Sequence, residues 1–318
     1  MKKVIFDTDI GIDDAMALLF LHHAPDVDLI AITTGFGNAS VSDTTRNALY
    51  MKERFNMSAA VYAGAATPVG SALGEGYADF VHGKNGLGDI PLTAPMCEAE
   101  AMPAAEAIVE LVRANPHALS FVAVGRMTNL ATALALDPEL PSLIKELVVM
   151  GGVFGYNGHR GNVSPVAEAN IAGDPLAADR VFTSGIPTTI VGLDVTAETV
   201  MNDAYIDQLR QTAGASGEFI YQISRFYFGF YEKVIGKAEC PIHDASAVAY
   251  LLRPDLYRTE AAVVRVATEG IAMGQTIHDS TRRVFATDDW LDLPTCNVCV
   301  GVDAPAVMAF YLSTLSEL

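Results

Sequence analysis

Four aspartates occur within eight residues near the start of the chain, where their carboxylates can bind a cation or activate water. They are Asp7, Asp9, Asp13 and Asp14, in the segment V-I-F-D-T-D-I-G-I-D-D-A. No lysine or arginine occurs from residue 4 to residue 41, so the repulsion among these carboxylates needs a positive charge from elsewhere. Oxygen ligands without His or Cys favour Ca²⁺ or Mg²⁺ over Zn²⁺. The segment therefore predicts a divalent-cation site, beside the ordinary alternative that an aspartate caps the following helix.

The acidic segment follows a short apolar run, and further apolar runs alternate with amphipathic ones. This alternation predicts an α/β fold with a mostly parallel, mixed sheet flanked by helices, in a single domain over residues 1–318. The expected strands are Val4–Phe6, Leu29–Thr33, Ala59–Tyr62, Ser120–Val124, Leu147–Met150, Thr188–Val191 and Val263–Val266. The expected helices are Ala15–His22, Ser42–Phe55, Pro103–Ala114, Asn129–Leu136, Pro175–Thr183, Asp203–Gln211, Glu218–Ile235, Ala245–Leu252 and Ala304–Leu315. The glycine-rich segment 70–88 is expected to be a long loop or lid.

In folds of this kind the ligand lies beyond the carboxyl ends of the strands. Besides the four aspartates, polar residues follow three of the expected strands. They are Asn38, the run Arg126-Met127-Thr128, and the group Asn162, Glu168 and Asn170. We therefore expect acids and amides to gather along one edge of the sheet.

The composition limits the classes of protein that the chain can belong to. Of 318 residues, 51% are hydrophobic and 18% charged, which excludes a disordered or fibrous chain. The 20 Lys+Arg against 38 Asp+Glu give a net charge of −18, which opposes general binding to nucleic acid or to anionic membranes. No signal peptide or membrane span is expected, because the N-terminal M-K-K-V-I-F-D reaches charge after three apolar residues and no apolar run is long enough. The chain is therefore expected to be soluble and cytoplasmic.

The four cysteines are too few for a disulfide framework in so long a chain, and their thiols indicate a reducing compartment. Cys296 and Cys299 form a C-x-x-C, but no second Cys or His pair stands at zinc spacing. Their apolar surroundings predict a strand in place of a metal site.

Two functions for the acidic segment stay open at this level, a phosphohydrolase and a non-catalytic binding protein. A strand followed by D-x-D is also typical of haloacid-dehalogenase phosphohydrolases, but Gly11 stands where that family has Thr or Val. The pair Asp288-Asp289 can imitate a later acidic motif of those enzymes, without a companion lysine. The other alternative is a non-catalytic protein that binds a nucleoside or sugar, which would not need the water-activating carboxylate of Asp13.

The segment D-T-D-I-G-I-D-D-A resembles D-x-D-x-G-x-D-D-A, the signature of the nucleoside hydrolases (inosine-uridine-preferring nucleoside N-ribohydrolases). Further segments resemble that family in the same order. They are T-G-F-G-N ending at Asn38, H-G-K-N-G-L-G at 82–88, V-G-R-M-T-N-L-A at 124–131, M-G-G at 150–152, G-N at 161–162, A-E-A-N at 167–170 and P-I-H-D-A at 241–245. The resemblance implies a Rossmann-like fold and Ca²⁺-dependent hydrolysis of the N-glycosidic bond of ribonucleosides to free base and ribose, in nucleoside salvage.

The resemblance also implies a set of metal ligands and a catalytic base. The implied Ca²⁺ ligands are Asp9, Asp14, the main-chain carbonyl of Met127, and Asp244, with the 2′- and 3′-hydroxyls of ribose completing the shell. Asp13 is implied to be the general base that activates a water. A hard cation that holds a cis-diol accounts for selectivity for ribose over 2′-deoxyribose.

The remaining residues implied by the resemblance contact the substrate. The expected contacts are Asp13, Asn38, His82, Met150, Asn162, Glu168, Asn170, Tyr227, Tyr231 and His243. Within this set, Asn38 is expected to orient the water or a ribose hydroxyl. His243 is expected to protonate the leaving base, with His82 as the alternative acid. Asn162 and Glu168 are expected to reach the 5′-hydroxyl. Tyr227 and Tyr231 lie four residues apart, on one helix face, where they can reach the base.

Two positions depart from the family pattern. Ala169 stands in E-A-N where an aromatic residue is usual, which leaves the base preference open, and Asn85 replaces an aspartate in the H-G-x-D-G-L-G loop. The resemblance further implies a homotetramer or a homodimer. It does not specify which base is preferred.

Overall fold

The computed structural model describes residues 1–71, 76–281 and 283–316. Within these ranges, nine strands form one sheet in the order β10-β9-β11-β6-β5-β4-β1-β2-β3. The strands are β1 (Lys2–Thr8), β2 (Val27–Thr34), β3 (Ala60–Ala63), β4 (Leu119–Ala123), β5 (Glu146–Met150), β6 (Thr188–Val191), β9 (Tyr257–Val266), β10 (Thr276–Asp279) and β11 (Thr295–Val302). From β11 to β3 all neighbours are parallel, whereas β9 and β10 are added in antiparallel pairing. The expected mostly parallel, mixed sheet is therefore confirmed.

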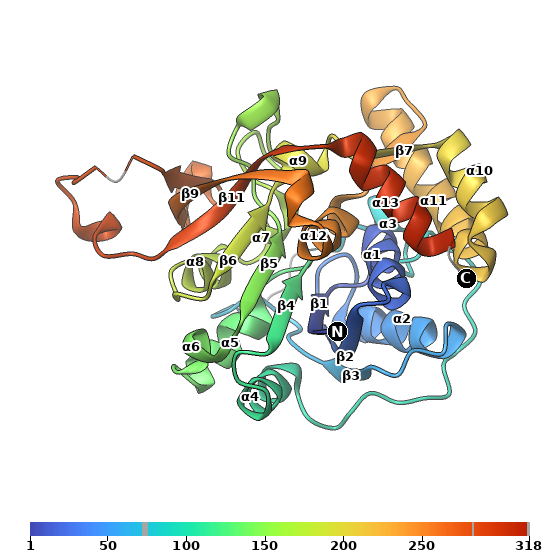
Figure 1. Ribbon diagram of the computed structural model, residues 1–318, viewed down its shortest axis with the longest axis horizontal. Helices are drawn as coiled ribbons and strands as arrows, with labels where there is room; N and C mark the ends of the chain where they lie inside the picture. The colour runs from blue at the N-terminus through green and yellow to red at the C-terminus, as the bar shows by residue number, and fades with distance from the viewer. Residues whose placement is uncertain (72–75, 282, 317–318) are drawn as a thin grey trace.

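Helices cover both faces of this sheet, as Figure 1 shows. They are α1 (Ile12–His23), α2 (Val41–Arg54), α3 (Asp79–His82), α4 (Ala104–Ala114), α5 (Thr128–Leu136), α6 (Leu140–Leu143), α7 (Ala169–Gly173), α8 (Pro175–Phe182), α9 (Leu193–Thr196), α10 (Asp203–Thr212), α11 (Gly214–Ile235), α12 (His243–Leu252) and α13 (Ala304–Ser316). A separate antiparallel ribbon pairs β7 (Val200–Asn202) with β8 (Glu239–Pro241). One apolar core joins the sheet to α1, α11, α12 and α13, and a second joins it to α4, α5 and α8.

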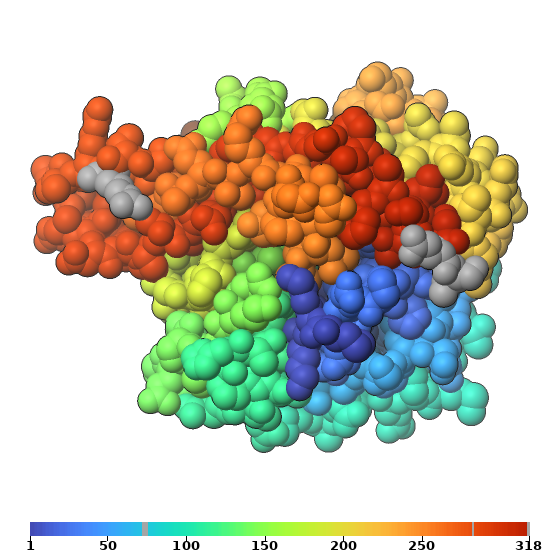
Figure 2. Space-filling model, in the orientation of Figure 1, coloured from blue at the N-terminus to red at the C-terminus, as the bar shows by residue number. Residues whose placement is uncertain are grey.

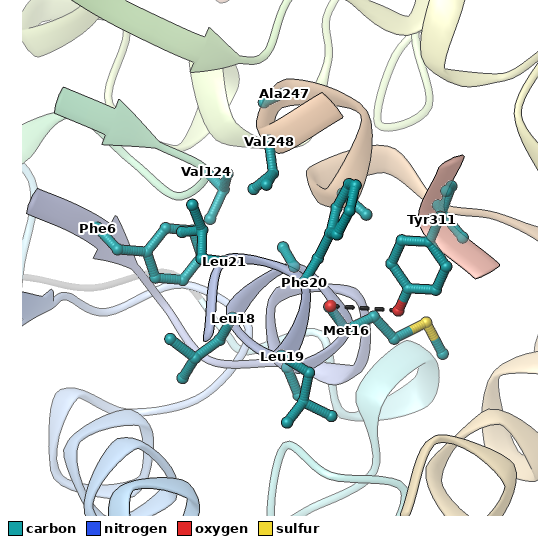
Figure 3. Packing of buried hydrophobic residues seen from close by; sticks show 14 of the residues in the cluster. Phe6, Met16, Leu18, Leu19, Phe20, Leu21, Val124, Ala247, Val248 and Tyr311 are labelled. Carbon is teal, nitrogen blue, oxygen red and sulfur yellow. Dashed lines mark hydrogen bonds between the residues drawn. The ribbon is translucent and has the colours of Figure 1, made fainter. Parts of the chain in front are cut away.

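Helix α1 is buried on all sides, which explains why its sequence is apolar all round instead of amphipathic. Phe20 packs edge-on against Tyr311 of α13, with ring centroids 4.9 Å apart. The hydroxyl of Tyr311 donates to the carbonyl oxygen of Met16 at 3.2 Å, closing this contact (Figure 3). A helix packed in this way gives the aspartates of its first turn a fixed position.

The expected strands and long helices are present, with boundaries that shift by a few residues. The largest consequence is at α1, which begins at Ile12 and not at Ala15, so that Asp13 and Asp14 lie inside the first turn. Cys296 and Cys299 lie in β11, which confirms the expected strand. All four cysteines lie in the described ranges and are free thiols. No helix in the described ranges is long and apolar enough to cross a membrane.

The glycine-rich segment is not a loop throughout, because α3 forms near its end and has His82 as its last residue. Residues 72–75 of that segment lie outside the described residues. The β7–β8 ribbon, the short helices α6, α7 and α9, and strand β10 were not predicted from the sequence. Each of these elements has five residues or fewer, too few for a periodic pattern to emerge.

Candidate active site

Three buried carboxylates meet at the carboxyl edge of the sheet. Among the described residues, Asp13, Asp14 and Asp244 form a group whose ligand oxygens lie within 4.8 Å of one another. The first two are in the first turn of α1, which follows β1, and Asp244 is in the first turn of α12. The group therefore depends on the N-termini of two helices, which start at Ile12 and His243 and are packed together by the core.

Asp14 is held by four donors. Its Oδ1 accepts from the Thr8 hydroxyl at 2.5 Å and from the Asp9 amide at 3.3 Å. Its Oδ2 accepts from the Gly11 amide and from Nδ2 of Asn38, both at 2.8 Å. Gly11 is the N-cap residue of α1, so the expectation that Asp13 or Asp14 occupies the N-cap position is wrong. Asp14 instead stabilises the helix start from its third position.

Asp9 and Asp13 each keep an unsatisfied oxygen. Oδ1 of Asp9 and Oδ1 of Asp13 are buried without a hydrogen-bond partner among the described residues. The other oxygen of Asp9 accepts from the Asn38 amide at 2.8 Å. Glycines allow this crowding, because a Cβ at Gly125 would lie 2.7 Å from Oδ1 of Asp9. Buried anionic oxygens without donors fit a bound cation, since such atoms are otherwise costly.

The electrostatics of the site agree with that conclusion. Burial, with the charge of Asp14 second, raises the pKa of Asp13 to about 8. Burial and the neighbouring carboxylates also raise the pKa values of Asp9 and Asp244 well above their ordinary value. A divalent cation would reverse these shifts because it favours the charged carboxylates.

Met127 caps the start of α5, and its carbonyl oxygen accepts the first helical bond, from the Ala131 amide at 2.9 Å. A carbonyl oxygen has two lone pairs, so one stays available for a ligand. Gly125, two residues earlier, is the glycine packed against Asp9. The chain therefore brings this carbonyl to the same end of β4 that borders the acidic group.

The expected sugar-binding residues follow β5 and border the same edge, but they are already bonded. Glu168 is buried and caps α7, accepting from the amides of Asn170 and Ile171 at 2.9 and 3.2 Å. It also accepts from the Gly152 amide at 3.0 Å. Burial raises its pKa. These contacts hold the Glu168 carboxylate against the backbone of Gly151 and Gly152.

Two amides complete this region. Nδ2 of Asn170 donates to the carbonyl oxygens of Val124 at 2.7 Å and Met150 at 3.2 Å, joining the ends of β4 and β5. Asn162 is exposed, and its Oδ1 accepts from the Ala169 amide at 3.0 Å. The alanine that departs from the family pattern is thus held through its backbone, and its small side chain fills little of the half-buried space.

His243 is held between two hydroxyl groups. Its Nδ1 lies 2.8 Å from Oγ1 of Thr196 in α9, and its Nε2 lies 3.1 Å from the hydroxyl of Tyr231 in α11. Burial, with His159 second, lowers its pKa to about 4, so the ring is neutral at pH 7. The contact between Thr196 and His243 was not predicted from the sequence. The two residues are 47 positions apart, and no local pattern in the four-residue helix α9 links them.

Tyr227 and His82 complete the wall beside Asp13. The hydroxyl of Tyr227 lies 3.4 Å from Oδ2 of Asp13, and the His82 ring stacks on the tyrosine with centroids 5.7 Å apart. Nδ1 of His82 accepts from the Ile12 amide at 3.1 Å, so the neutral ring carries its proton on Nε2. Burial lowers the pKa of His82 to about 3. The structure thus brings His82, Tyr227, Tyr231 and His243 around one wall of the carboxylate group.

Comparison with known proteins defines the class. The model of the inosine-uridine preferring nucleoside hydrolase family matches residues 4–309. The chain belongs to this family, and the prediction of a nucleoside hydrolase is confirmed.

Several relatives are similar over almost their whole length. Uridine nucleosidase 1 of Arabidopsis thaliana is 37% identical, with 99% of this chain and 94% of the relative covered. The pyrimidine-specific ribonucleoside hydrolase RihB of Escherichia coli is 35% identical over 87% of each. Among solved structures, a plant nucleoside hydrolase (PpNRh1) superposes with a TM-score of 0.95 at 33% identity, covering 100% of this chain and 99% of that one. A purine-preferring ribonucleoside hydrolase from Gardnerella vaginalis superposes with a TM-score of 0.92 at 34% identity, covering 99% and 98%.

The phosphohydrolase alternative also fails on geometry. Asp288 and Asp289 are exposed, in the segment that follows β10 and projects from the body of the molecule (Figure 2). The main-chain oxygen of Asp289 accepts from Arg265, on β9. They therefore lie outside the carboxylate group formed by α1 and α12.

Proposed function

We propose that the chain hydrolyses the N-glycosidic bond of ribonucleosides with Ca²⁺ as its cofactor. The observation that carries the proposal is the pair of donor-less oxygens, on Asp9 and Asp13, within a buried acidic site. The donor set contains oxygen atoms without a thiolate, which suits Ca²⁺. The proposed ligands are Asp9, Asp14, Asp244 and the carbonyl of Met127. Asp13 lies in the same cluster as two of them, so its assignment as base and not ligand is part of the proposal.

Ca²⁺, when bound, would orient the ribose diol and the attacking water and polarise that water. Asp13 accepts the proton of the water as its oxygen bonds to C1′ of the ribose. The C1′–N bond breaks at the same time, and its electron pair goes to the leaving base. His243, with Tyr231 on its Nε2, must first take up a proton, because its ring is neutral at pH 7, and then supplies that proton to the leaving base.

The other residues hold the substrate for this reaction. Asn38 donates one hydrogen bond to Asp9 and one to Asp14 and so fixes the positions of these two carboxylates relative to each other. Asn162, Glu168, Asn170 and Met150 are proposed to line the sugar site. His82 is proposed to lie over the base, beside Tyr227. The names of two relatives favour uridine as the first substrate to test.

We further propose that residues 1–318 act as one domain and assemble as a homodimer or homotetramer in the cytoplasm. Free thiols at all four cysteines support a reducing compartment. Light scattering after size exclusion would measure the assembly, and a monomeric mass at micromolar concentration would reject it.

The deciding experiment incubates the purified protein with ribonucleosides, 2′-deoxyribonucleosides and nucleotides, with Ca²⁺ and again after chelation. We expect release of ribose from one or more ribonucleosides, lost on chelation and restored by Ca²⁺. The 2′-deoxy analogue should react roughly 10⁴-fold more slowly, because the groups that bind the 2′-hydroxyl would be left unpaired. Ribose release that persists after chelation would reject the metal, and ligand-induced stabilisation without product would indicate a binding protein.

A further inference from the structure

Asn47 lies in helix α2, outside the carboxylate site, and its side chain is completely buried. Its Nδ2 donates to the carbonyl oxygen of Asn85 at 2.8 Å and to that of Ile10 at 3.2 Å. Its Oδ1 accepts from Nη2 of Arg46 at 3.0 Å. One amide group therefore joins two segments that are 75 residues apart in the sequence.

One of the two segments contains Asp13, and the other places His82 beside it. The catalytic loop, residues 9–13, carries Asp9 and Asp13, and the His82 segment, residues 79–90, carries His82 and Asn85. Their approach is close at Gly86, which has a φ of 80°. A Cβ there would lie 2.8 Å from Nδ2 of Asn47 and 3.2 Å from the carbonyl oxygen of Ile10. The segment reaches this position because residue 86 has no side chain.

The same segment contacts the catalytic loop a second time, at its other end. His82 accepts from the Ile12 amide, and its Nδ1 lies 3.9 Å from Oδ1 of Asp13. Asn85 holds the intervening turn, since its Oδ1 accepts from the amides of Leu87 and Asp89 at 2.8 and 3.0 Å. Nη2 of Arg46 also donates to the Asn85 carbonyl oxygen, at 2.9 Å, and to Oδ1 of Asn47. Loss of the Asn47 side chain would remove one of the two donors to that carbonyl and the acceptor that orients the other, and so loosen the segment that places His82 beside Asp13.

We propose that Asn47 is a positioning residue, which holds the His82 segment against the catalytic loop by donating to both. This role rests on the proposed function, because His82 is proposed there to lie over the base. Within the part of the chain that the structure describes, the side-chain amide of Asn47 hydrogen-bonds to Arg46, Ile10 and Asn85 and to none of the carboxylates or expected substrate contacts.

Trypsin offers a test that does not depend on activity. Lys84 is exposed and is the sole lysine or arginine between Arg54 and Arg113, so cleavage there gives the fragments 1–84 and 85–318. The bond cut precedes Asn85, the residue that Asn47 holds. Asn47→Ala should increase the rate of cleavage after Lys84 roughly five- to tenfold, since proteolysis follows the population of the open form.

The matched control is Leu49→Ala, which truncates a buried apolar side chain of the same helix and removes no hydrogen bond to the His82 segment. It should leave the cleavage rate after Lys84 and the KM unchanged while lowering the Tm. Asn47→Ala should raise the KM by about the same factor as it raises the cleavage rate, and should change kcat less. Gly86→Ala is the second variant, in case Asn47→Ala does not fold, and should show the same two effects.

The proposal is wrong if Asn47→Ala and Gly86→Ala are cleaved after Lys84 no faster than Leu49→Ala. It is also wrong if cleavage accelerates while the KM stays at the wild-type value, because the segment would then not serve the substrate. Absence of nucleosidase activity in the wild-type chain would reject the proposed function instead, and would leave the comparison of cleavage rates intact.

Discussion

Oγ1 of Thr196 lies 2.8 Å from Nδ1 of His243, on the side of the ring opposite the Tyr231 hydroxyl. This contact joins α9 to the first turn of α12 and restricts rotation of the imidazole. A ring fixed in this way presents Nε2 toward the tyrosine and the wall beside Asp13. Thr196 is therefore expected to influence the reaction through His243 without contacting the substrate.

Thr196→Val should lower kcat roughly five- to tenfold, which corresponds to one hydrogen bond of about 1 kcal/mol, and should leave the KM nearly unchanged. Thr196→Ser restores the hydroxyl and should recover most of the lost rate. Steady-state kinetics on the substrate found in the panel would measure both. Equal losses in the valine and serine variants would show that packing, and not the hydroxyl, is what His243 requires.

Asp13→Asn tests the division of tasks among the carboxylates. It should lower kcat by roughly 10²–10⁴-fold, because the water loses its proton acceptor. Calorimetric Ca²⁺ binding should stay within about tenfold of the wild type. Asp244→Asn should instead weaken Ca²⁺ binding by at least roughly 10–100-fold. That is the loss typical of removing a residue that only supports a metal ligand, and Asp244 is proposed to be a ligand itself. If Asp13→Asn weakens Ca²⁺ binding as strongly as Asp244→Asn, Asp13 is a ligand.

The stability of the metal-free protein should fall as the pH rises from about 4 to about 8. Asp13 has its pKa raised to about 8 by burial, so in this range the folded chain retains a proton that the unfolded chain has released. The protonated Asp13 therefore adds its full contribution to the stability of the folded chain below the ordinary pKa of an aspartate. This contribution decreases as the pH rises and is lost once the pH passes the raised pKa of Asp13. Asp9 and Asp244 shift in the same direction.

Ca²⁺ should oppose this loss, since it binds the deprotonated carboxylates. Thermal unfolding in chelator and in excess Ca²⁺ should show a larger rise in Tm at pH 8 than at pH 5. At a free concentration 100 times the Kd, the stabilisation is about 2.7 kcal/mol. An equal rise at both pH values would show that the ion binds away from these carboxylates.

Asn85→Asp restores the residue usual in the family and tests why asparagine is present. Nδ2 of Asn85 donates to the carbonyl oxygen of Ile90 at 2.9 Å, which a carboxylate cannot do. The substitution should lower the free energy of unfolding by about 1–3 kcal/mol, because two acceptors would face each other without a proton between them. Urea unfolding of the Ca²⁺-loaded protein measures this, and an unchanged midpoint would show that the loop rearranges at no cost.

Local patterns in the sequence were sufficient for several parts of this protein. Four aspartates after an apolar strand pointed to a cation site, and alternating apolar and amphipathic runs indicated the parallel sheet. Because parallel strands present their carboxyl ends at one edge, the segments that contain Asp13, Asn38 and Asn170 were expected to meet there. The ordered motifs identified the family, since each lies in one short segment whose residue types can be read directly.

Tertiary structure alone decided how those segments are bonded. The start of α1 at Ile12 makes Asp14 a stabiliser of the helix and leaves Asp9 and Asp13 with free oxygens. Thr196 meets His243, and Asn47 meets Asn85, because α9, α2 and the His82 segment are packed against one core. Such pairs join residues far apart in the chain through single polar atoms, and no local periodicity records them. Their geometry is set by the buried helices beneath the site.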